Sequence, residues 1–432
     1  MRIKGTKKSL RGSLAMPGDK SISHRAVMLA ALADGRTEIG GFLRGEDCLN
    51  TLKNFKMMGV DYIEKKDKLL IKGRGLKGLQ KPGKALDVGN SGTAFRLMTG
   101  ILAGQEFITK LTGDASIQKR PMKRVVEPLR KMGGRFSGES APLIIFPGKL
   151  KGLNYESPIA SAQVKSALLL AGLYASGAVS VTEKVLSRDH TERMLKNFGV
   201  KLKTDTSVSG KYKVTLPAGR HKLRGGLKIA VPGDFSSAAF FIVAALLVPG
   251  SKITLKNIGV NPARAGLIDV LKKMGARLAL KNKKIVSGEP VADIEAAYSP
   301  LKGTTVDGAL IVRLIDEVPV LAAAAALAQG RTVIKDAGEL RVKESDRLKS
   351  ICALLSAFGF KAGETADGLI IDGSPGRQIS KNIKIDPAYD HRIAMTAAVL
   401  GLLNQKETLI SADKCIETSF PRFEQALLGA LK

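Results

Sequence analysis

The 432-residue sequence contains no Trp, and aromatic residues make up only 5% of it. The aromatic platforms on which single-stranded nucleic acid stacks are therefore scarce. Three Cys, at positions 48, 352 and 415, are far apart and odd in number. They indicate a reducing compartment, with neither a disulfide framework nor a zinc site. The longest apolar run, 238–248, is too short to span a bilayer, and the basic N-terminus lacks the apolar core of a secretory signal. We therefore expect a cytoplasmic protein that binds no membrane.

Acidic residues are also under-represented, because 39 Asp and Glu oppose 69 Lys and Arg and leave a net charge of +30. Such an excess is compatible with a nucleic-acid binder, with a solvated basic surface, or with a site for a small, highly anionic substrate. The sequence has no zinc-finger spacing, and its four His are scattered. We therefore expect neither a metal site nor nucleic acid as the main partner.

Internal repetition is the strongest organisational feature. An apolar helix, a break at small residues and a β-branched strand recur six times, about every 70–80 residues, in 23–42, 92–113, 165–183, 236–259, 316–338 and 390–412. An amphipathic helix closed by Gly follows five of these copies, at 52–59, 129–133, 195–199, 271–275 and 354–359. Strands are expected between the helices, as at 69–72, 143–146, 212–216 and 369–372. This alternation predicts an α/β fold.

The two halves of the chain repeat each other. The stretch Val231–Ser237 has the same Pro-Gly-Asp turn as Met16–Ser21, almost half the chain away. We therefore expect two similar domains of three repeats each, with the chain crossing between them near these two turns. The expected domains are residues 19–232, and residues 1–18 combined with 233–432.

The stretch Pro17–Arg25 places Lys20, Ser21 and Arg25 at the start of a predicted helix. Free backbone N–H groups and the positive end of the helix dipole also lie there, so this stretch is suited to an anion. It is not a nucleotide-binding P-loop, because Asp19 stands where that motif requires Gly before Lys-Ser.

Four further helix openings carry polar or cationic groups: Asp87–Arg96 with Gly92, Arg120 before Pro-Met, Ser161–Lys165 with Gln163, and Asp390–Arg392. Gly at an opening lets backbone N–H groups approach a ligand, and Arg binds carboxylate or phosphate with two parallel bonds. Each opening alone is also compatible with an ordinary capped helix.

Two acids stand among these cations. Asp316 precedes an Ala-rich helix, and Glu344 lies within Arg341–Arg347. The second stretch is also compatible with a salt-bridged helix face, because Glu344 and Lys343 stand three and four residues before Arg347. In a cation-rich site, one carboxylate can instead serve as a base and another group as an acid.

Taken in order, Pro17–Arg25, Asn90–Thr93, Arg120–Met122, Arg341–Arg347 and Asp390–Arg392 together resemble the 5-enolpyruvylshikimate-3-phosphate (EPSP) synthase family. The resemblance covers the whole chain. It implies the enolpyruvyl transferase fold, an inside-out α/β barrel of two domains, each of three βαβαββ units, joined by two crossover segments. It also implies transfer of the enolpyruvyl group of phosphoenolpyruvate to the 5-hydroxyl of shikimate 3-phosphate, in the shikimate pathway, by a monomer without a cofactor.

The resemblance also implies roles for individual residues. Asp316 would be the base for the 5-hydroxyl, and Glu344 would handle proton transfer at C3, sharing that work with Lys20. Shikimate 3-phosphate would be bound by Lys20, Ser21, Arg25, Ser161, Gln163, Asp316 and Lys343, with Arg188 as a further candidate. Phosphoenolpyruvate would be bound by Lys20, Gly92, Arg120, Gln163, Arg347 and Arg392.

At Ala162, Glu339 and Thr418 the sequence departs from some family members, which have Ser, Asn and Lys at these three positions. These departures concern the outer binding shell, and the Thr-Ser-Phe-Pro stretch at 418–421 resembles a divergent branch. Some herbicide-tolerant members have Ala where this chain has Gly92, so we expect sensitivity to glyphosate.

Two alternatives remain open at this point. UDP-N-acetylglucosamine enolpyruvyl transferases share the fold and the donor, and members typically use a catalytic Cys on a loop of the first domain. Here Cys48 is the sole Cys before residue 352 and is expected beside a helix start. A basic nucleic-acid-binding repeat protein is the other alternative, but it leaves Asp316 and Glu344 unexplained.

Overall fold

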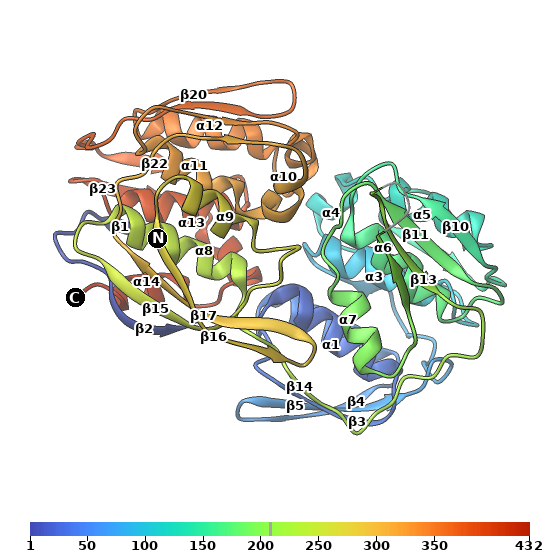
Figure 1. The fold of residues 1–432 in the computed structure, drawn as a ribbon. Coiled ribbons are helices and arrows are strands. Elements are labelled where there is room, and N and C mark those ends of the chain that lie inside the picture. The colour runs from blue at the N-terminus through green and yellow to red at the C-terminus, as the bar shows by residue number, and fades with distance from the viewer. Residues whose placement is uncertain (207–209) are drawn as a thin grey trace. The chain divides into compact units, whose positions relative to one another are not determined.

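A computed structural model of the chain describes residues 1–206 and 210–432. The chain divides into two compact units (Figure 1). Unit 1 comprises Met1–Pro17, Pro232–Ile285 and Pro290–Lys432, and unit 2 comprises Gly18–Val231 and Val286–Glu289. The expected boundaries, 1–18 with 233–432 and 19–232, differ from these by one residue at each crossover. The hairpin turn at 286–289 groups with unit 2, which no sequence pattern indicated.

Unit 2 contains three successive repeats, each with its own four-stranded sheet. The first has α1 (Lys20–Leu32), β3 (Asp34–Gly40), α2 (Glu46–Met57), β4 (Asp61–Lys65), β5 (Lys68–Arg74) and β14 (Lys228–Ala230). The second has β6 (Leu86–Asp87), α3 (Gly92–Leu102), β7 (Thr109–Thr112), α4 (Ala115–Lys119), α5 (Lys123–Lys131), β8 (Arg135–Phe136) and β9 (Leu143–Phe146). The third has β10 (Leu153–Glu156), α6 (Ala162–Gly172), β11 (Val179–Glu183), α7 (His190–Asn197), β12 (Lys203–Asp205) and β13 (Tyr212–Leu216).

Unit 1 repeats the same plan. Its first repeat has β2 (Arg11–Ala15), α8 (Phe235–Leu247), β15 (Lys252–Gly259), α9 (Gly266–Lys273), β16 (Arg277–Val286) and β17 (Glu289–Ala297). The second has β18 (Thr305–Val306), α10 (Gly308–Leu314), the 3-10 turn η1 (Ile315–Glu317), α11 (Val318–Ala326), β19 (Arg331–Ile334), η2 (Gly338–Val342), α12 (Arg347–Ala357), β20 (Lys361–Glu364) and β21 (Leu369–Asp372). The last has β22 (Ile383–Ile385), α13 (His391–Gly401), β23 (Glu407–Ile410), η3 (Asp413–Thr418), α14 (Phe423–Gly429) and β1 (Arg2–Lys4).

Every four-stranded sheet has one parallel pair and two antiparallel pairs in the same order. In the third sheet of unit 2, for example, Leu153 pairs in parallel with Val179, which pairs antiparallel with Leu216. The last sheet of unit 1 has three strands, in the order β1-β23-β22, so the N-terminal strand completes the C-terminal repeat. The α/β fold with three repeats per half is thereby confirmed.

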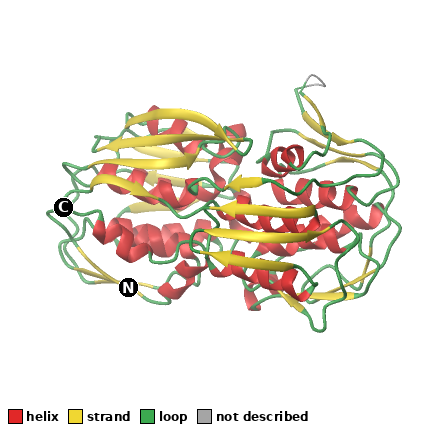
Figure 2. Cartoon of the chain, turned by 90° about the horizontal axis from the view of Figure 1, so that it is seen from below, coloured by secondary structure: helices red, strands yellow, loops and turns green. Residues whose placement is uncertain are grey.

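Inside each unit, one buried helix of each repeat packs against the equivalent helices of the other repeats rather than facing solvent. In unit 1, α8, α11 and α13 contact one another, and in unit 2 α3 contacts both α1 and α6 (Figure 1). Figure 2 shows strands lying over helices. Every residue of α8, α11 and α13 is buried. A helix that is apolar on all sides must be covered on all sides, and the sheets provide that cover.

The amphipathic second helices end as the sequence predicts. The glycines that close them, Gly59, Gly133, Gly199, Gly275 and Gly359, all have φ between 85° and 95°. That left-handed conformation terminates a helix and is costly for residues with a Cβ atom. Among the described residues, no helix combines the length and hydrophobicity needed to cross a membrane.

Four of the five helix openings that carried the candidate motifs are capped by a side chain, while α5, which follows Arg120, has no side-chain cap. Asp19 accepts a hydrogen bond from Ile22 N, and Asp234 accepts one from Ser237 N in the same way. The repeated Pro-Gly-Asp turn therefore supplies the N-cap of α1 and of α8. Ser91, Ser161 and Asp390 cap α3, α6 and α13. Capping fixes the direction of each helix start and so positions the side chains beside it.

Candidate active site

In unit 2, Lys20 is the first residue of α1 and lies beside the carboxylate of Asp47 on α2. Their Nζ and Oδ2 atoms are 3.0 Å apart, and 19% of the Lys20 side chain is exposed. An ammonium group at a helix N-terminus faces the positive end of the helix dipole, so a carboxylate partner offsets that repulsion. The pair holds a cation at the opening, as predicted, while Asp47 was not anticipated.

Arg25 lies one turn further along α1 and is almost fully buried. Its guanidinium donates to Thr191 Oγ1 at 2.7 Å, to Ser166 Oγ at 2.8 Å and to the carbonyl oxygen of Ser21 at 3.0 Å. Burial lowers the pKa of Arg25 to about 10, against the opposing effect of Glu192. The group therefore stays cationic at neutral pH and is held rigidly from three sides.

His24 joins three of the elements around this opening. Its Nδ1 lies 2.8 Å from Thr51 Oγ1 on α2, and its Nε2 lies 3.2 Å from the Oγ of Ser91, the cap of α3. Burial, together with Lys20 and Arg25, holds the pKa of His24 well below its usual value. The imidazole is therefore neutral and acts as a structural connector.

Two guanidinium groups converge on Gly92 at the start of α3. A Cβ atom at Gly92 would lie 3.0 Å from a terminal nitrogen of Arg120 and 3.1 Å from one of Arg96. Arg96 also donates to Gln163 Oε1 at 2.5 Å, and Gln163 donates to Thr93 Oγ1 at 2.9 Å. The structure thus brings the predicted Gly92, Arg120 and Gln163 together.

Arg96 also belongs to this group, although the sequence motifs implied no role for it. Arg96 lies four residues after Gly92 on α3, so both face the same side of the helix. The four-residue spacing in the sequence therefore already indicated that Arg96 lies beside Gly92. Arg120 is oriented in turn by Asn90, whose Oδ1 accepts a hydrogen bond from it at 2.7 Å.

Ser161 caps α6, and a buried charge cluster lies behind it. The Ser161 N–H donates to Glu183 Oε1 at 3.0 Å, and Ser187 N–H donates to Glu183 Oε2 at 3.2 Å. The fully buried Lys165 ammonium lies 2.9 Å from both Glu183 and Glu192. Although burial alone would lower the pKa of Lys165, the two carboxylates raise it above its usual value. Arg188 follows Ser187, and its positive charge contributes to lowering the pKa of Arg25.

In unit 1, Asp316 lies in η1, directly before the Ala-rich α11, as predicted. Four cationic side chains surround its carboxylate. Lys343 Nζ and Arg347 approach Asp316 Oδ1 at 3.5 Å each, while Arg264 and Arg392 approach Oδ2 at 4.0 Å. Only 13% of the Asp316 side chain is exposed. A carboxylate in such surroundings is held in its ionised form.

Arg347 is the most constrained of these cations, with 1% of its side chain exposed. It lies 2.7 Å from Asp390 and 2.6 Å from Glu344. Burial alone would lower the pKa of Arg347, but Asp390 and Glu344 raise it above its usual value. Helix α12 begins at Arg347, so Lys343 and Glu344 precede the helix and the salt-bridged helix-face interpretation is wrong. The Glu344–Arg347 pair nevertheless forms.

Arg392 is the second residue of α13, behind the Asp390 cap. It donates to the carbonyl oxygen of Asp316 at 2.7 Å and lies 3.6 Å from Glu317. The structure therefore gathers the predicted Asp316, Lys343, Glu344, Arg347 and Arg392 in unit 1. Asp390, part of the predicted Asp390–Arg392 opening, also joins them. Arg264 and Glu317 join them without having been predicted, because their contacts link segments far apart in the sequence.

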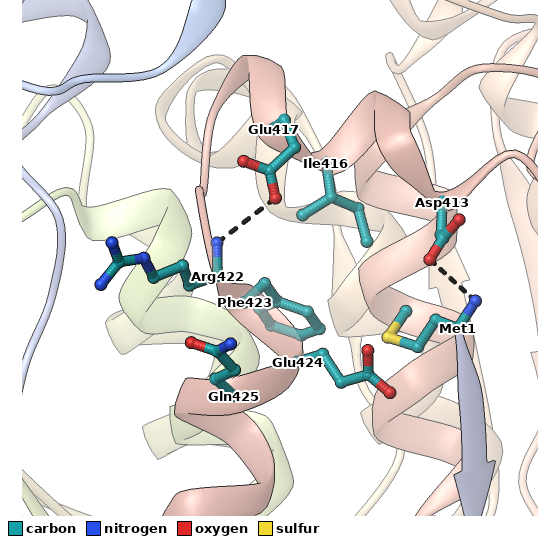
Figure 3. A pocket seen from close by; sticks show the side chains of 8 residues that line it. All are labelled: Met1, Asp413, Ile416, Glu417, Arg422, Phe423, Glu424 and Gln425. Carbon is teal, nitrogen blue, oxygen red and sulfur yellow. Dashed lines mark hydrogen bonds and ion pairs between the residues drawn. The ribbon is translucent and has the colours of Figure 1, made fainter.

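A pocket elsewhere in unit 1 contains none of these groups. It has a volume of about 200 Å³ and is lined by Met1, Asp413, Ile416, Glu417, Arg422, Phe423, Glu424 and Gln425 (Figure 3). The Met1 ammonium lies 2.7 Å from Asp413 at its edge. Within residues 1–206 and 210–432, no group of His, Cys, Asp and Glu has the arrangement that would hold a metal ion.

The family model for "EPSP synthase (3-phosphoshikimate 1-carboxyvinyltransferase)" matches residues 4–427. The chain belongs to the EPSP synthase family. Curated relatives named 3-phosphoshikimate 1-carboxyvinyltransferase include one from Brevibacillus brevis, 51% identical with 98% of this chain and 97% of the relative covered. Another, from Geobacter sulfurreducens, is also 51% identical, with 97% and 96% covered.

Solved structures agree with this assignment to the EPSP synthase family. The EPSP synthase of Acinetobacter baumannii superposes with a TM-score of 0.86 at 44% identity, covering 100% of this chain and 98% of that one. The enolpyruvyl transferase NikO from Streptomyces tendae superposes with a TM-score of 0.79 at 14% identity, covering 100% and 97%. The second likeness supports the enolpyruvyl transferase fold alone.

Proposed function

We propose that the chain transfers the enolpyruvyl group of phosphoenolpyruvate to the 5-hydroxyl of shikimate 3-phosphate and releases phosphate. Membership of the EPSP synthase family supports the reaction. The observation that carries the assignment to this site is the Asp316 carboxylate, which lies 3.5–4.0 Å from four cationic side chains. An ionised carboxylate among groups that bind anions is suited to accept a proton beside an anionic substrate.

The reaction is an addition followed by an elimination. In the addition, the 5-hydroxyl oxygen bonds to C2 of phosphoenolpyruvate, Asp316 accepts the hydroxyl proton, and C3 gains a proton from Glu344 or Lys20. In the elimination, C3 gives up a proton, the C2–C3 double bond re-forms, and the C2–O bond to phosphate breaks. No electrons leave or enter the substrates, so the steps need no redox cofactor.

The proposed substrate-binding groups of unit 2 are cations and hydroxyls at helix openings. Lys20, Ser21, Arg25, Ser161 and Gln163 would bind shikimate 3-phosphate, with Arg188 as a further candidate. Lys20, Gly92, Arg120 and Gln163 would bind phosphoenolpyruvate. The convergence of Arg96 and Arg120 on Gly92 supports this role, because backbone N–H groups and two guanidinium forks suit a carboxylate or phosphate.

The proposed groups of unit 1 combine acid–base chemistry with anion binding. Asp316 and Glu344 would transfer protons, Lys343 and Asp316 would contact shikimate 3-phosphate, and Arg347 and Arg392 would bind phosphoenolpyruvate. The carboxylates that hold Arg347 and Arg392 keep both guanidinium groups oriented before substrate arrives. Such preorganisation removes reorganisation from the reaction step. We further propose that the protein acts as a cytoplasmic monomer.

Cys48 argues against the UDP-sugar alternative. It lies within α2, is fully buried, and its Sγ contacts the carbonyl oxygen of Lys20 at 3.7 Å. A thiol that adds to a substrate has to be accessible.

Phosphate release is the decisive assay. We expect release with phosphoenolpyruvate and shikimate 3-phosphate together, and none when either is omitted. Release with UDP-N-acetylglucosamine in place of shikimate 3-phosphate would reject the proposal in favour of the alternative.

A further inference from the structure

The second Pro-Gly-Asp turn, in Val231–Ser237, has no cation where the first turn has Lys20, yet a buried cation reaches it. Arg264 follows β15 in the loop before α9, and 4% of its side chain is exposed. Its guanidinium donates to Ser236 Oγ at 2.5 Å and lies 3.7 Å from the carboxylate of Asp234, the cap of α8. This turn therefore holds an arginine of the same unit.

The other end of the Arg264 guanidinium points toward η1. Its second terminal nitrogen lies 3.6 Å from Glu317 Oε1 and 4.0 Å from Asp316 Oδ2. The Glu317 side chain is fully buried, and Oε1 also accepts a hydrogen bond from the Ser236 hydroxyl. The turn, Arg264 and η1 thus form one buried network.

Glu317 connects this network to the proposed phosphoenolpyruvate ligand Arg392. A terminal nitrogen of Arg392 lies 3.6 Å from Glu317 Oε1 and 2.7 Å from the main-chain oxygen of Asp316. A buried carboxylate is tolerated only with charged or hydrogen-bonding partners. Glu317 therefore requires both arginines, and each arginine is held in place by it.

We propose that Arg264 and Glu317 are positioning residues that hold the Asp316 carboxylate and the Arg392 guanidinium in their reactive orientation. The inference rests on the proposed function. The charged groups around Asp316 include its chain neighbour Glu317 in η1, Arg264 from the loop after β15, Lys343 and Arg347 from the segment before and at the start of α12, and Arg392 from α13. Lys343 is 29% exposed, whereas the Arg264 side chain is only 4% exposed. Arg264 therefore supports Asp316 from the buried side, together with Arg347 and Arg392.

Replacement of Arg264 tests the inference. In Arg264→Met we expect kcat to fall by about 10²-fold, since a displacement of about 1 Å in a reacting group has that effect. Removal of one cation makes the Asp316 carboxylate easier to protonate, so the acid limb of the kcat–pH profile moves to higher pH. Arg264→Lys keeps the positive charge but replaces the planar guanidinium by an ammonium group. We expect the acid limb of its kcat–pH profile to stay near that of the wild type. A merely structural role would not produce this pH difference.

Replacement of Glu317 and Ser236 tests the connection to Arg392. Glu317→Gln keeps the size and removes the charge, and we expect a higher KM for phosphoenolpyruvate with little change in KM for shikimate 3-phosphate. Ser236→Ala removes only the hydroxyl that joins Arg264 to Glu317, and a smaller change in the same direction is expected. Arg331→Met is the matched control, because Arg331 pairs with Asp372 on the exposed surface of the same unit. Its kcat, KM values and pH profile should match the wild type.

Folding of each variant is verified by thermal unfolding. A folded Arg264→Met protein with wild-type kcat and pH profile overturns the inference. If Arg264→Met does not fold, wild-type kinetics in both Glu317→Gln and Ser236→Ala overturn it instead. A wild-type protein that releases no phosphate from the two substrates overturns the proposed function, and this inference with it. An active wild type with unaffected variants rejects the inference alone.

Discussion

Asp316 shows how a single residue acquires a role from its surroundings. In the sequence it is one of many acids, whereas in the fold its carboxylate faces Arg264, Lys343, Arg347 and Arg392. These cations keep it ionised, and only the ionised form accepts a proton from a hydroxyl.

Replacement of Asp316 by Asn removes the proton acceptor and keeps the shape. We expect kcat for phosphate release to fall by about 10²–10⁴-fold, the usual contribution of a general base, with smaller changes in the KM values. Steady-state kinetics at saturating phosphoenolpyruvate and shikimate 3-phosphate measure this. A folded Asp316→Asn protein with unchanged kcat would remove Asp316 from the role of base.

The presence of Gly rather than Ala at position 92 predicts that the protein is sensitive to the inhibitor glyphosate. We expect the wild-type protein to be inhibited by millimolar-scale glyphosate at limiting phosphoenolpyruvate. In Gly92→Ala the new methyl group would lie 3.0–3.1 Å from Arg120 and Arg96, so both guanidinium groups must shift by a few tenths of an ångström. The inhibitory glyphosate concentration and the KM for phosphoenolpyruvate should both rise, by about tenfold for displacements of this size.

Gly138→Ala is the control, because a Cβ atom there meets nothing within 4 Å. Undiminished wild-type activity under these conditions would contradict the expected sensitivity. Equal inhibition of the wild type and Gly92→Ala would contradict the crowding argument.

At the scale of elements, the opening of α6 depends on charges that are completely buried. Lys165 on α6 pairs with Glu183 at the end of β11 and with Glu192 on α7, and its ammonium lies 5.0 Å from the ring centroid of Tyr212 on β13. Glu183 in turn binds the backbone of Ser161 and Ser187. One cation therefore joins the elements of the third repeat of unit 2.

Lys165→Met leaves two buried carboxylates without their cation. We expect a loss of about 3–5 kcal/mol in the free energy of unfolding, as when one partner of a buried ion pair is removed. Lys211→Met, which removes an exposed pair with Glu156, should cost about 0–1 kcal/mol. Urea unfolding followed by far-UV circular dichroism measures both variants. Equal losses in the two variants would show that the buried cluster contributes no more than a surface pair.

In unit 1, Asp293 on β17 holds an irregularity in the neighbouring strand β15. The pairing register shifts between Leu255 and Ile258, and Asn257 has φ of 52°. Asp293 accepts hydrogen bonds from Lys256 Nζ at 2.8 Å, from Asn257 N at 2.9 Å and from Asn282 Nδ2 at 2.8 Å. These donors, Lys256 first, lower the pKa of Asp293 from 3.8 to about 2. A β-bulge leaves an N–H without its ladder partner, and this carboxylate replaces that partner.

The lowered pKa predicts a pH-dependent contribution to stability. The ionised Asp293 stabilises the fold fully above its unfolded-state value of 3.8, and the contribution is lost as the pH falls toward about 2. Asp293→Asn should therefore be less stable than the wild type at pH 7, and the difference should shrink between about pH 4 and pH 2. Urea midpoints across this range measure it, with Glu295→Gln on the same strand as the control. A difference that is independent of pH would contradict the role of the ionised carboxylate.

At the scale of the whole molecule, the net charge of +30 exceeds what the proposed anion-binding groups require. Much of the excess lies on exposed lysines, such as Lys281, Lys283 and Lys284 of β16. Charge of this kind attracts any polyanion without recognising a sequence.

We therefore expect weak, non-specific binding of duplex DNA that disappears at physiological salt. Electrophoretic mobility shift at rising salt concentration measures it, since each released counterion steepens the salt dependence. A shift at submicromolar protein that survives physiological salt would favour the nucleic-acid-binding alternative.

The sequence alone determined the α/β repeats, the Gly-closed helices and the capped helix openings, because each depends on residues close together in the chain. Hydrophobic periodicity, a left-handed Gly and an N-cap Asp act within a few residues. The ordered motifs also named the groups later found together in each unit, such as Gly92 with Arg120 and Asp316 with Arg347.

Only the tertiary structure decided which further groups hold those residues in place. Asp47 beside Lys20, Arg96 beside Gln163, and Arg264 with Glu317 behind Asp316 come from separate segments. The tertiary structure also decided that the turn Val286–Glu289 groups with unit 2, although most of β16 and β17, the strands that it joins, lies in unit 1. Charges and hydrogen bonds act through space, and burial makes them strong. Their partners are therefore set by how the repeats pack, which no local pattern of residues encodes.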